Sequence, residues 1–186
     1  MPSTPELSAR EKIIPAIARV FRRFGYEAAS LSLLSSETGL VRSSLYHFFP
    51  GGKEQMAAAV LDLAEHHVRE VFMQALVAPD ALDRQVDKFI AKLTEYYEGG
   101  EIGCILSSLT LHDCPPAIAA RVADLTEQWI AAIAAYLGAR GDPPAQAQTK
   151  AEQAVRLIEG GLVLALATRQ PRRFETSLQD LRALLT

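Results

Sequence analysis

Apolar side chains recur every three or four positions along the first 25 residues, which predicts an amphipathic helix. Ser8 and Glu11 have the spacing of a capping box, so the helix is expected to begin there and to end at Gly25. Pro15 lies inside it and cannot donate a hydrogen bond to the carbonyl of Glu11, which predicts a local bend or a looser first turn. The apolar positions of this helix are Ile13, Ile14, Ile17, Val20, Phe21 and Phe24.

A shorter helix is predicted between Ser30 and Gly39. Ser30 is its expected N-cap, because a serine oxygen accepts a hydrogen bond from the first helical turn. Leu31 and Leu34 then point inward, and Gly39 supplies the left-handed residue with which many helices end.

Another short helix is predicted from about 42 to 49, and Pro50 ends it. Its inward side is expected to carry Leu45, Phe48 and Phe49, at spacings of three and four. Val41 precedes it and has no side-chain oxygen with which to cap it. Two short helices joined by a tight turn form a helix-turn-helix.

The remainder of the chain reads as helix throughout, since it is rich in Ala, Leu, Gln, Glu and Arg with helical periodicity. The expected fold class is therefore all-α, with a C-terminal helical bundle following the N-terminal three helices. The expected ranges are 53–77, 80–98, 103–112, 115–138, 145–168 and 174–185.

Composition and charge narrow the function classes. The 186 residues carry a net charge of −3, and 22% of them are charged. Seven basic and five acidic residues lie in 1–55, so the excess negative charge belongs to the remainder of the chain. No apolar run is long enough for a membrane helix and no signal peptide is recognisable, which favours a cytoplasmic protein. Two cysteines are too few for a disulfide scaffold.

Three linked segments within roughly 10–60 resemble the DNA-binding domain of the TetR family of transcriptional regulators. They are Phe-Arg-Arg-Phe-Gly-Tyr at 21–26, the supporting helix at 30–39, and Leu-Tyr-His-Phe-Phe-Pro at 45–50. The extra glycine in Phe-Pro-Gly-Gly-Lys-Glu-Gln at 49–55, with Gly-Cys at 103–104, is similar to the LmrA/YxaF-like branch of the family. The resemblance implies a DNA-binding domain over 1–52 and a ligand-binding and dimerisation domain over 53–186.

The outer face of the second short helix is the candidate DNA-binding surface, because tyrosine, histidine, serine and arginine suit phosphate and base-edge contacts. The resemblance implies that Ser43 and Ser44 enter the major groove and that Tyr46 and His47 hold the backbone. Lys53 would meet a phosphate at the start of the next helix. The full candidate set is Ser30, Ser32, Arg42, Ser43, Ser44, Tyr46, His47 and Lys53.

Aromatic and apolar residues of the later helices are ordinary core by default, but they are also candidates to line an effector cavity. The candidate ligand-binding residues are Phe72, Phe89, Leu93, Tyr96, Tyr97, Cys104, Leu109, His112, Trp129 and Ile133. The resemblance also implies a homodimer through the last two helices. Its candidate interface residues are Ile158, Leu162, Ala165, Leu178, Leu181 and Leu185.

These observations favour a dimeric transcriptional repressor that a small apolar or aromatic effector releases from a palindromic operator. A small all-α enzyme that uses Cys104, His112 and Asp113 is the alternative, and an adaptor with a vestigial helix-turn-helix is a third reading. Gly51, Gly52 and Lys53 lack the remaining residues of a phosphate-binding loop and are interpreted as a turn. Neither a metal ion nor a cofactor is expected.

Overall fold

The computed structural model describes residues 8–77, 82–110 and 113–186. Within these ranges the chain forms helices and no strand, so the all-α expectation is confirmed. None of the described helices is long and apolar enough to cross a membrane. The elements are α1 (Ala9–Ala28), α2 (Leu31–Thr38), α3 (Arg42–Phe48), α4 (Gly52–His66), the π-helical segment η1 (His67–Phe72), α5 (Met73–Val77), α6 (Leu82–Tyr96), the 3₁₀ turn η2 (Glu98–Gly100), α7 (Ile105–Thr110), α8 (Pro116–Ala139), α9 (Pro144–Thr168) and α10 (Arg172–Leu185).

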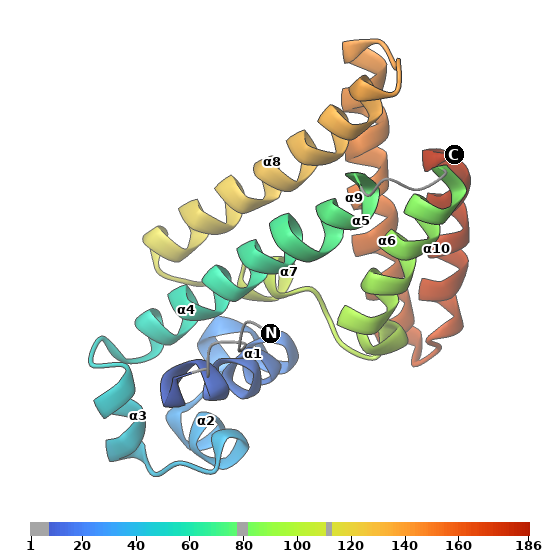
Figure 1. Ribbon diagram of the computed structural model, residues 1–186. Coiled ribbons are helices and arrows are strands. Elements are labelled where there is room, and N and C mark those ends of the chain that lie inside the picture. The colour runs from blue at the N-terminus through green and yellow to red at the C-terminus, as the bar shows by residue number, and fades with distance from the viewer. Residues whose placement is uncertain (1–7, 78–81, 111–112) are drawn as a thin grey trace, which may run out of the picture.

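The helix-turn-helix and its supporting helix form one end of the molecule, and the later helices form the other (Figure 1). The long helix made of α4, η1 and α5 runs between the two ends and packs on α1 and on α8. The antiparallel pair α9 and α10 lies on the far side, with α6 against α10. The DNA-binding end therefore contacts the later helices through both α4 and α7.

The first helix begins at the predicted capping box. The Ser8 hydroxyl accepts from the Glu11 amide at 3.2 Å, and the Glu11 carboxylate accepts from the Ser8 amide at 2.7 Å. The bend expected at Pro15 is not found. Within α1 only Gly25 departs from helical dihedral angles, at φ 71°. The fixed φ of proline fits a helix, so its cost here is the lost backbone hydrogen bond.

Residues 53–77 were expected to form one regular α-helix, and this expectation is wrong in one respect. The α-helical bonding stops at His66, and the six residues from His67 to Phe72 form a π-helical segment before α5 continues. A π-helical segment accommodates an extra residue inside a helix. The sequence periodicity alone did not reveal it.

The helices α9 and α10 approach closely because Gly161 has no side chain. A Cβ at Gly161 would lie 2.6 Å from the Cβ of Ser177 on α10. The neighbouring Gly160 faces open space, with nothing within 4 Å of such a Cβ. Of these two glycines, only Gly161 is therefore required for the close packing of α9 against α10.

Candidate functional site

The turn between α2 and α3 is held by short-range hydrogen bonds. The Ser30 hydroxyl accepts from the Leu33 amide at 3.2 Å, as predicted for an N-cap. Gly39 has φ 69° and ends α2 in the left-handed conformation. The Ser35 hydroxyl donates to the carbonyl of Leu40, which ties the turn back to α2. The sequence thus specifies this turn locally, before any distant part of the chain is considered.

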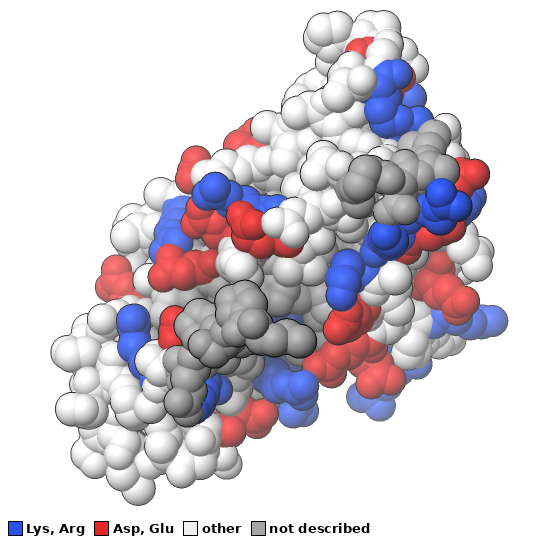
Figure 2. All heavy atoms as spheres, in the orientation of Figure 1, with Lys and Arg blue, Asp and Glu red and all other residues white. Residues whose placement is uncertain are grey.

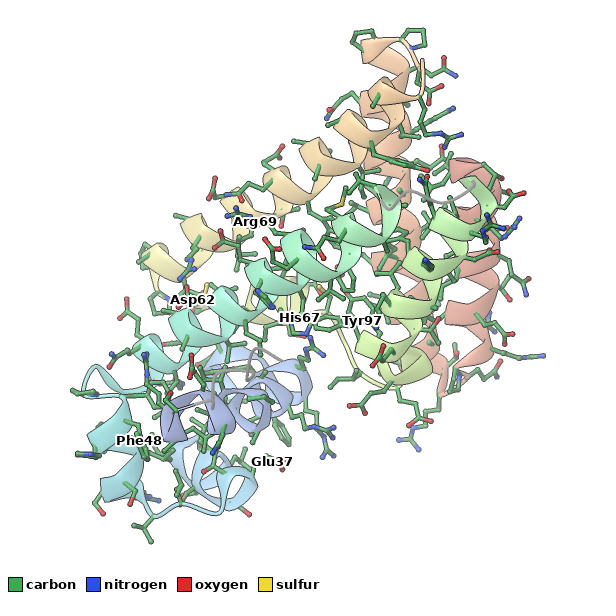
Figure 3. The ribbon with its side chains drawn as sticks, viewed as in Figure 1. Glu37, Phe48, Asp62, His67, Arg69 and Tyr97 are labelled. Atoms are coloured by element: carbon green, nitrogen blue, oxygen red, sulfur yellow. The ribbon has the colours of Figure 1, made fainter. Side chains whose placement is uncertain are left out.

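Helix α3 presents a polar and aromatic outer face. Leu45 and Phe49 are fully buried beneath it, whereas Ser43, Tyr46 and His47 are exposed. Phe48 is half-buried on the side that faces α1, so its expected inward orientation is only partly realised (Figure 3). Val41 is the N-cap and provides no side-chain hydrogen bond, as the sequence indicated. Few charged side chains are visible on this end of the molecule (Figure 2).

The candidate cations beside α3 are held by the protein itself. Arg42 donates from its guanidinium to the Ser32 hydroxyl across the turn. Lys53 donates to the carbonyl of Glu27 at 3.0 Å, and its ammonium lies 4.5 Å from the centre of the Tyr26 ring. Both side chains are therefore oriented before any ligand arrives. Ser44 of α3 is half-buried.

A contact that the sequence did not reveal joins α1 to the later helices. The Arg22 guanidinium stacks 4.1 Å from the Tyr96 ring centre and donates to the Tyr96 carbonyl at 3.2 Å. The His67 ring lies 4.7 Å from the Tyr96 ring, and burial lowers the pKa of His67. From α7 the Ser108 hydroxyl donates to the Arg22 carbonyl at 3.2 Å.

His67 lies on the side of the long helix that faces α6, and Tyr97, which directly follows α6, lies on that same side (Figure 3). Asp62 and Arg69 lie instead toward α8, where Arg121 pairs with Asp62 and Glu65. The long helix is therefore anchored on two opposite sides. The Phe-Arg-Arg-Phe pattern placed Arg22 on α1, but no local pattern identifies its partners.

Most of the expected effector-binding aromatics form solid core. Phe72 contacts Phe89, Tyr96 and Trp129, with ring centres 5.2 to 6.5 Å apart. Leu93, Leu109 and Ile133 are fully buried. His112 lies outside the described residues. These side chains support the bundle, and among the expected set only Trp129 lines the pocket described next.

A pocket of about 400 Å³ lies between α7, α8 and α9. Its walls are mostly apolar, and its polar lining comes from Ser107, Thr110, Thr126 and Glu159 together with the Trp129 ring. None of these except Trp129 was anticipated, because hydroxyl residues and a glutamate on helices look like ordinary surface positions. Side chains from three helices meet here only after the bundle has formed.

Cys104 is buried beside the pocket residue Glu159. Burial, reinforced by the carboxylate of Glu159, raises the pKa of the Cys104 thiol to about 12. A nucleophilic cysteine needs the opposite shift. Asp113 is exposed, and no metal-binding cluster of His, Cys, Asp and Glu occurs in the described part of the chain. The geometry thus gives no support to the alternative enzyme.

The six expected interface residues do not lie on a free surface. Ile158, Leu162, Ala165, Leu178, Leu181 and Leu185 are each at most 4% exposed within a single chain. They form the contact of α9 and α10 with the rest of the bundle. The exposed apolar side chains on α9 are instead Val163 at 57%, Leu164 at 51% and Leu166 at 43%. The six expected residues are therefore already used for packing within one protomer.

Two family models match the chain. Residues 13–60 match the bacterial regulatory proteins of the tetR family, and residues 78–179 match the LmrA/YxaF-like C-terminal domain of transcriptional regulators. The second match covers more than half of the chain. The chain belongs to the TetR family of transcriptional regulators, in its LmrA/YxaF-like branch. It is a DNA-binding transcriptional regulator and not an enzyme.

Relatives and solved structures agree with this assignment. The HTH-type transcriptional regulator LmrA of Bacillus subtilis is 28% identical, over 87% of this chain and 88% of its own length. An uncharacterised HTH-type transcriptional regulator of Mycobacterium tuberculosis is also 28% identical, over 95% of this chain and 93% of its own length.

The crystal structure of a TetR regulator from Legionella pneumophila has a TM-score of 0.85 at 19% identity, covering 98% of this chain and all of that one. A cysteine mutant of the TetR family regulator CifR, solved with a 26-bp double-strand operator DNA, has a TM-score of 0.70 at 20% identity. The coverage is 97% of this chain and 99% of that one. These two likenesses concern the fold.

Proposed function

We propose that this TetR-family regulator is a cytoplasmic homodimeric repressor that a small effector releases from a palindromic operator. In this proposal residues 1–52 bind DNA, with Ser43 and Ser44 of α3 in the major groove and Tyr46 and His47 on the backbone. Residues 53–186 bind the effector and the second copy. The exposed outer face of α3, over its buried Leu45, supports the DNA-binding role.

The proposed effector response is supported mainly by the position of α7, which contacts both the pocket and the DNA-binding end. Its residues Leu106, Ser107 and Thr110 line the pocket, and its Ser108 holds the backbone of Arg22 in α1. A ligand that moves α7 therefore changes a contact of the DNA-binding end. The effector acts by preferring the state in which the two recognition helices no longer match half-sites one helical turn apart.

The energy required is modest. A 100-fold loss of operator affinity corresponds to about 2.7 kcal/mol of differential effector binding between the two states. A few contacts of α7 that differ between the states are enough for this.

Electrophoretic mobility shift on the DNA upstream of the chain's own gene tests the proposal. We expect a specific retarded band that survives competitor DNA and weakens with salt. An effector should abolish the band and, by linkage, should bind more weakly to the protein–DNA complex than to the free protein. No specific band, or a band that requires an effector to form, would overturn the repressor assignment.

A further inference from the structure

One carboxylate among the described residues lines the pocket between α7, α8 and α9. Glu159 projects from the middle of α9, and the remaining lining is apolar or carries hydroxyl groups, apart from the Trp129 ring. The lining contains neither lysine nor arginine. A carboxylate in an apolar cavity without a cation is costly, because its charge has lost water and gained no opposite charge.

The neighbours of Glu159 are neutral groups. Cys104 and Ser107 are the polar groups near its carboxylate, and no basic group is among the neighbours that shift its ionisation. Burial raises the pKa of Glu159, the direction expected for a carboxyl that lacks a cationic partner. No described Lys or Arg forms an ion pair with Glu159, although other glutamates such as Glu152 and Glu65 have arginine partners.

Glu159 is also connected to the aromatic core. The Tyr97 hydroxyl donates to the Cys104 sulfur at 3.6 Å, and the Cys104 thiol lies close enough to the Glu159 carboxylate for each to shift the pKa of the other. Tyr97 and Cys104 are both almost fully buried, so the groups behind the carboxylate are neutral and shielded from water. The pocket therefore has one acceptor of positive charge.

The pocket also offers apolar surface to a ligand. Gly160 and Val163 line it from α9 and are exposed, and Leu106 and Val122 are buried deeper in the wall. A volume of about 400 Å³ lies in the range of small-molecule sites, which bind mainly through apolar contact with a few placed polar groups.

From this arrangement we infer that the pocket binds an apolar molecule that carries a basic nitrogen, whose ammonium group pairs with Glu159. The inference rests on the proposed function, since it names the chemical class of the effector. The apolar part of the ligand fills the space between Leu106, Val122 and Val163. The ammonium supplies the positive charge that the pocket lacks, and it donates hydrogen bonds to the Glu159 carboxylate.

Three probes of similar size and shape test the inference, namely p-butylbenzylamine, p-butylbenzyl alcohol and p-butylbenzoate. Calorimetric titration of the full chain without DNA should show the amine binding about 10-fold or more tightly than the alcohol. The benzoate should bind most weakly, because its charge repels Glu159. Quenching of Trp129, the sole tryptophan, would place the amine in this pocket.

The substitution Glu159→Gln keeps the size of the side chain and removes its charge. It should abolish the preference for the amine while leaving the affinity for the alcohol within about twofold. Glu152→Gln is the matched control, since Glu152 lies two turns earlier on α9, pairs with Arg156 and is not part of the pocket lining. It should keep the wild-type preference.

The outcomes separate the two proposals. Equal binding of amine and alcohol to the wild type, or a preference that survives Glu159→Gln, overturns the inference whatever the protein does with DNA. Preferential amine binding in a protein that forms no specific operator complex supports the pocket assignment and overturns only the repressor function. Amine binding that leaves operator affinity unchanged shows a ligand site that is not an effector site, and it likewise contradicts the proposed function alone.

Discussion

The outer faces of α3 and α9 are both exposed, but their chemistry differs. On α3, Ser43, Tyr46 and His47 stand over a fully buried Leu45. On α9, the exposed Leu164 is aliphatic and lies outside the pocket lining. Water solvates the α3 face well, whereas Leu164 leaves apolar surface in contact with water.

The difference shows what each face is suited to bind. A hydroxyl, a phenol and an imidazole exchange hydrogen bonds with water for hydrogen bonds with phosphate or base edges, so this face is well hydrated when no DNA is bound. Aliphatic side chains gain only when another apolar surface covers them. We expect a second copy of the chain to cover this face of α9, and substitutions on the two faces should therefore have separable effects.

The largest effect is expected from a charge on the α9 face. Leu164→Glu places a carboxylate where the proposed dimer buries apolar surface, so the dimer should dissociate and operator affinity should fall by at least about 100-fold. The protomer should stay folded, because Leu164 is already 51% exposed. Light scattering at micromolar concentration and helical circular dichroism check the two results.

Two controls sharpen this prediction. Val77→Glu adds the same charge at an exposed valine on α5 and should leave the dimer intact. Leu162→Glu, two residues from Leu164, should unfold the chain instead, because Leu162 is only 1% exposed within its own protomer. A folded, fully dimeric Leu164→Glu protein would refute the assignment of the α9 face.

The adjacent glycines of α9 should differ in the free energy of unfolding. Gly161→Ala forces Ser177 and α10 away and should lower it by about 1–3 kcal/mol. Gly160→Ala has open space and should raise it by up to about 1 kcal/mol, since alanine favours a helix more than glycine does. Urea unfolding of both variants gives the comparison. If both variants lost stability equally, the close approach of α9 and α10 would not depend on Gly161.

A smaller effect is expected on α3. Tyr46→Phe keeps the ring that lies against Gly52 and removes only the hydroxyl. It should weaken DNA binding by roughly 1 kcal/mol, for operator and for unrelated duplex alike, because a phosphate contact carries no sequence information. Fluorescence anisotropy with both duplexes measures this. A loss confined to the operator would instead assign Tyr46 to base recognition, and no loss at all would remove it from the interface.

The smallest effect on DNA binding is expected from a substitution of Lys53. Its ammonium already binds the carbonyl of Glu27, so Lys53→Ala removes an internal hydrogen bond as well as a candidate phosphate contact. Loss of one phosphate contact should reduce the slope of log affinity against log salt by about 0.9. Binding measured over a range of salt concentrations reveals this. A weaker affinity with an unchanged slope would mean that Lys53 only supports the fold.

The sequence predicted the helix-turn-helix well because its determinants are local. Ser30 caps α2 through a residue three positions away, and Gly39 ends the helix through its own backbone angle. Such local determinants can be recognised in a sequence without any knowledge of tertiary packing.

The sequence predicted α9 correctly as a helix but did not show which of its apolar stripes the protomer itself buries. Ile158, Leu162 and Ala165 form one apolar stripe, and Val163 and Leu164 belong to another. Periodicity identifies stripes without telling which one the protomer covers, since that depends on α8 and α10. The pocket was missed for a related reason. Glu159 looks like a solvent-exposed helical glutamate until Cys104 and Ser107 are brought beside it.

The π-helical segment His67–Phe72 resets the phase of the long helix. If the chain continued as a regular α-helix from the buried Ala64, its core-facing positions would fall near 68, 71 and 75. The buried residues of this segment are instead Phe72 and Leu76. One additional residue explains this offset, because each residue turns an α-helix by about 100°. Deleting one residue within 67–72 should therefore be tolerated far better than deleting one within 56–64. The segment is a place where the chain can change in length while the core-facing residues on both sides stay in phase.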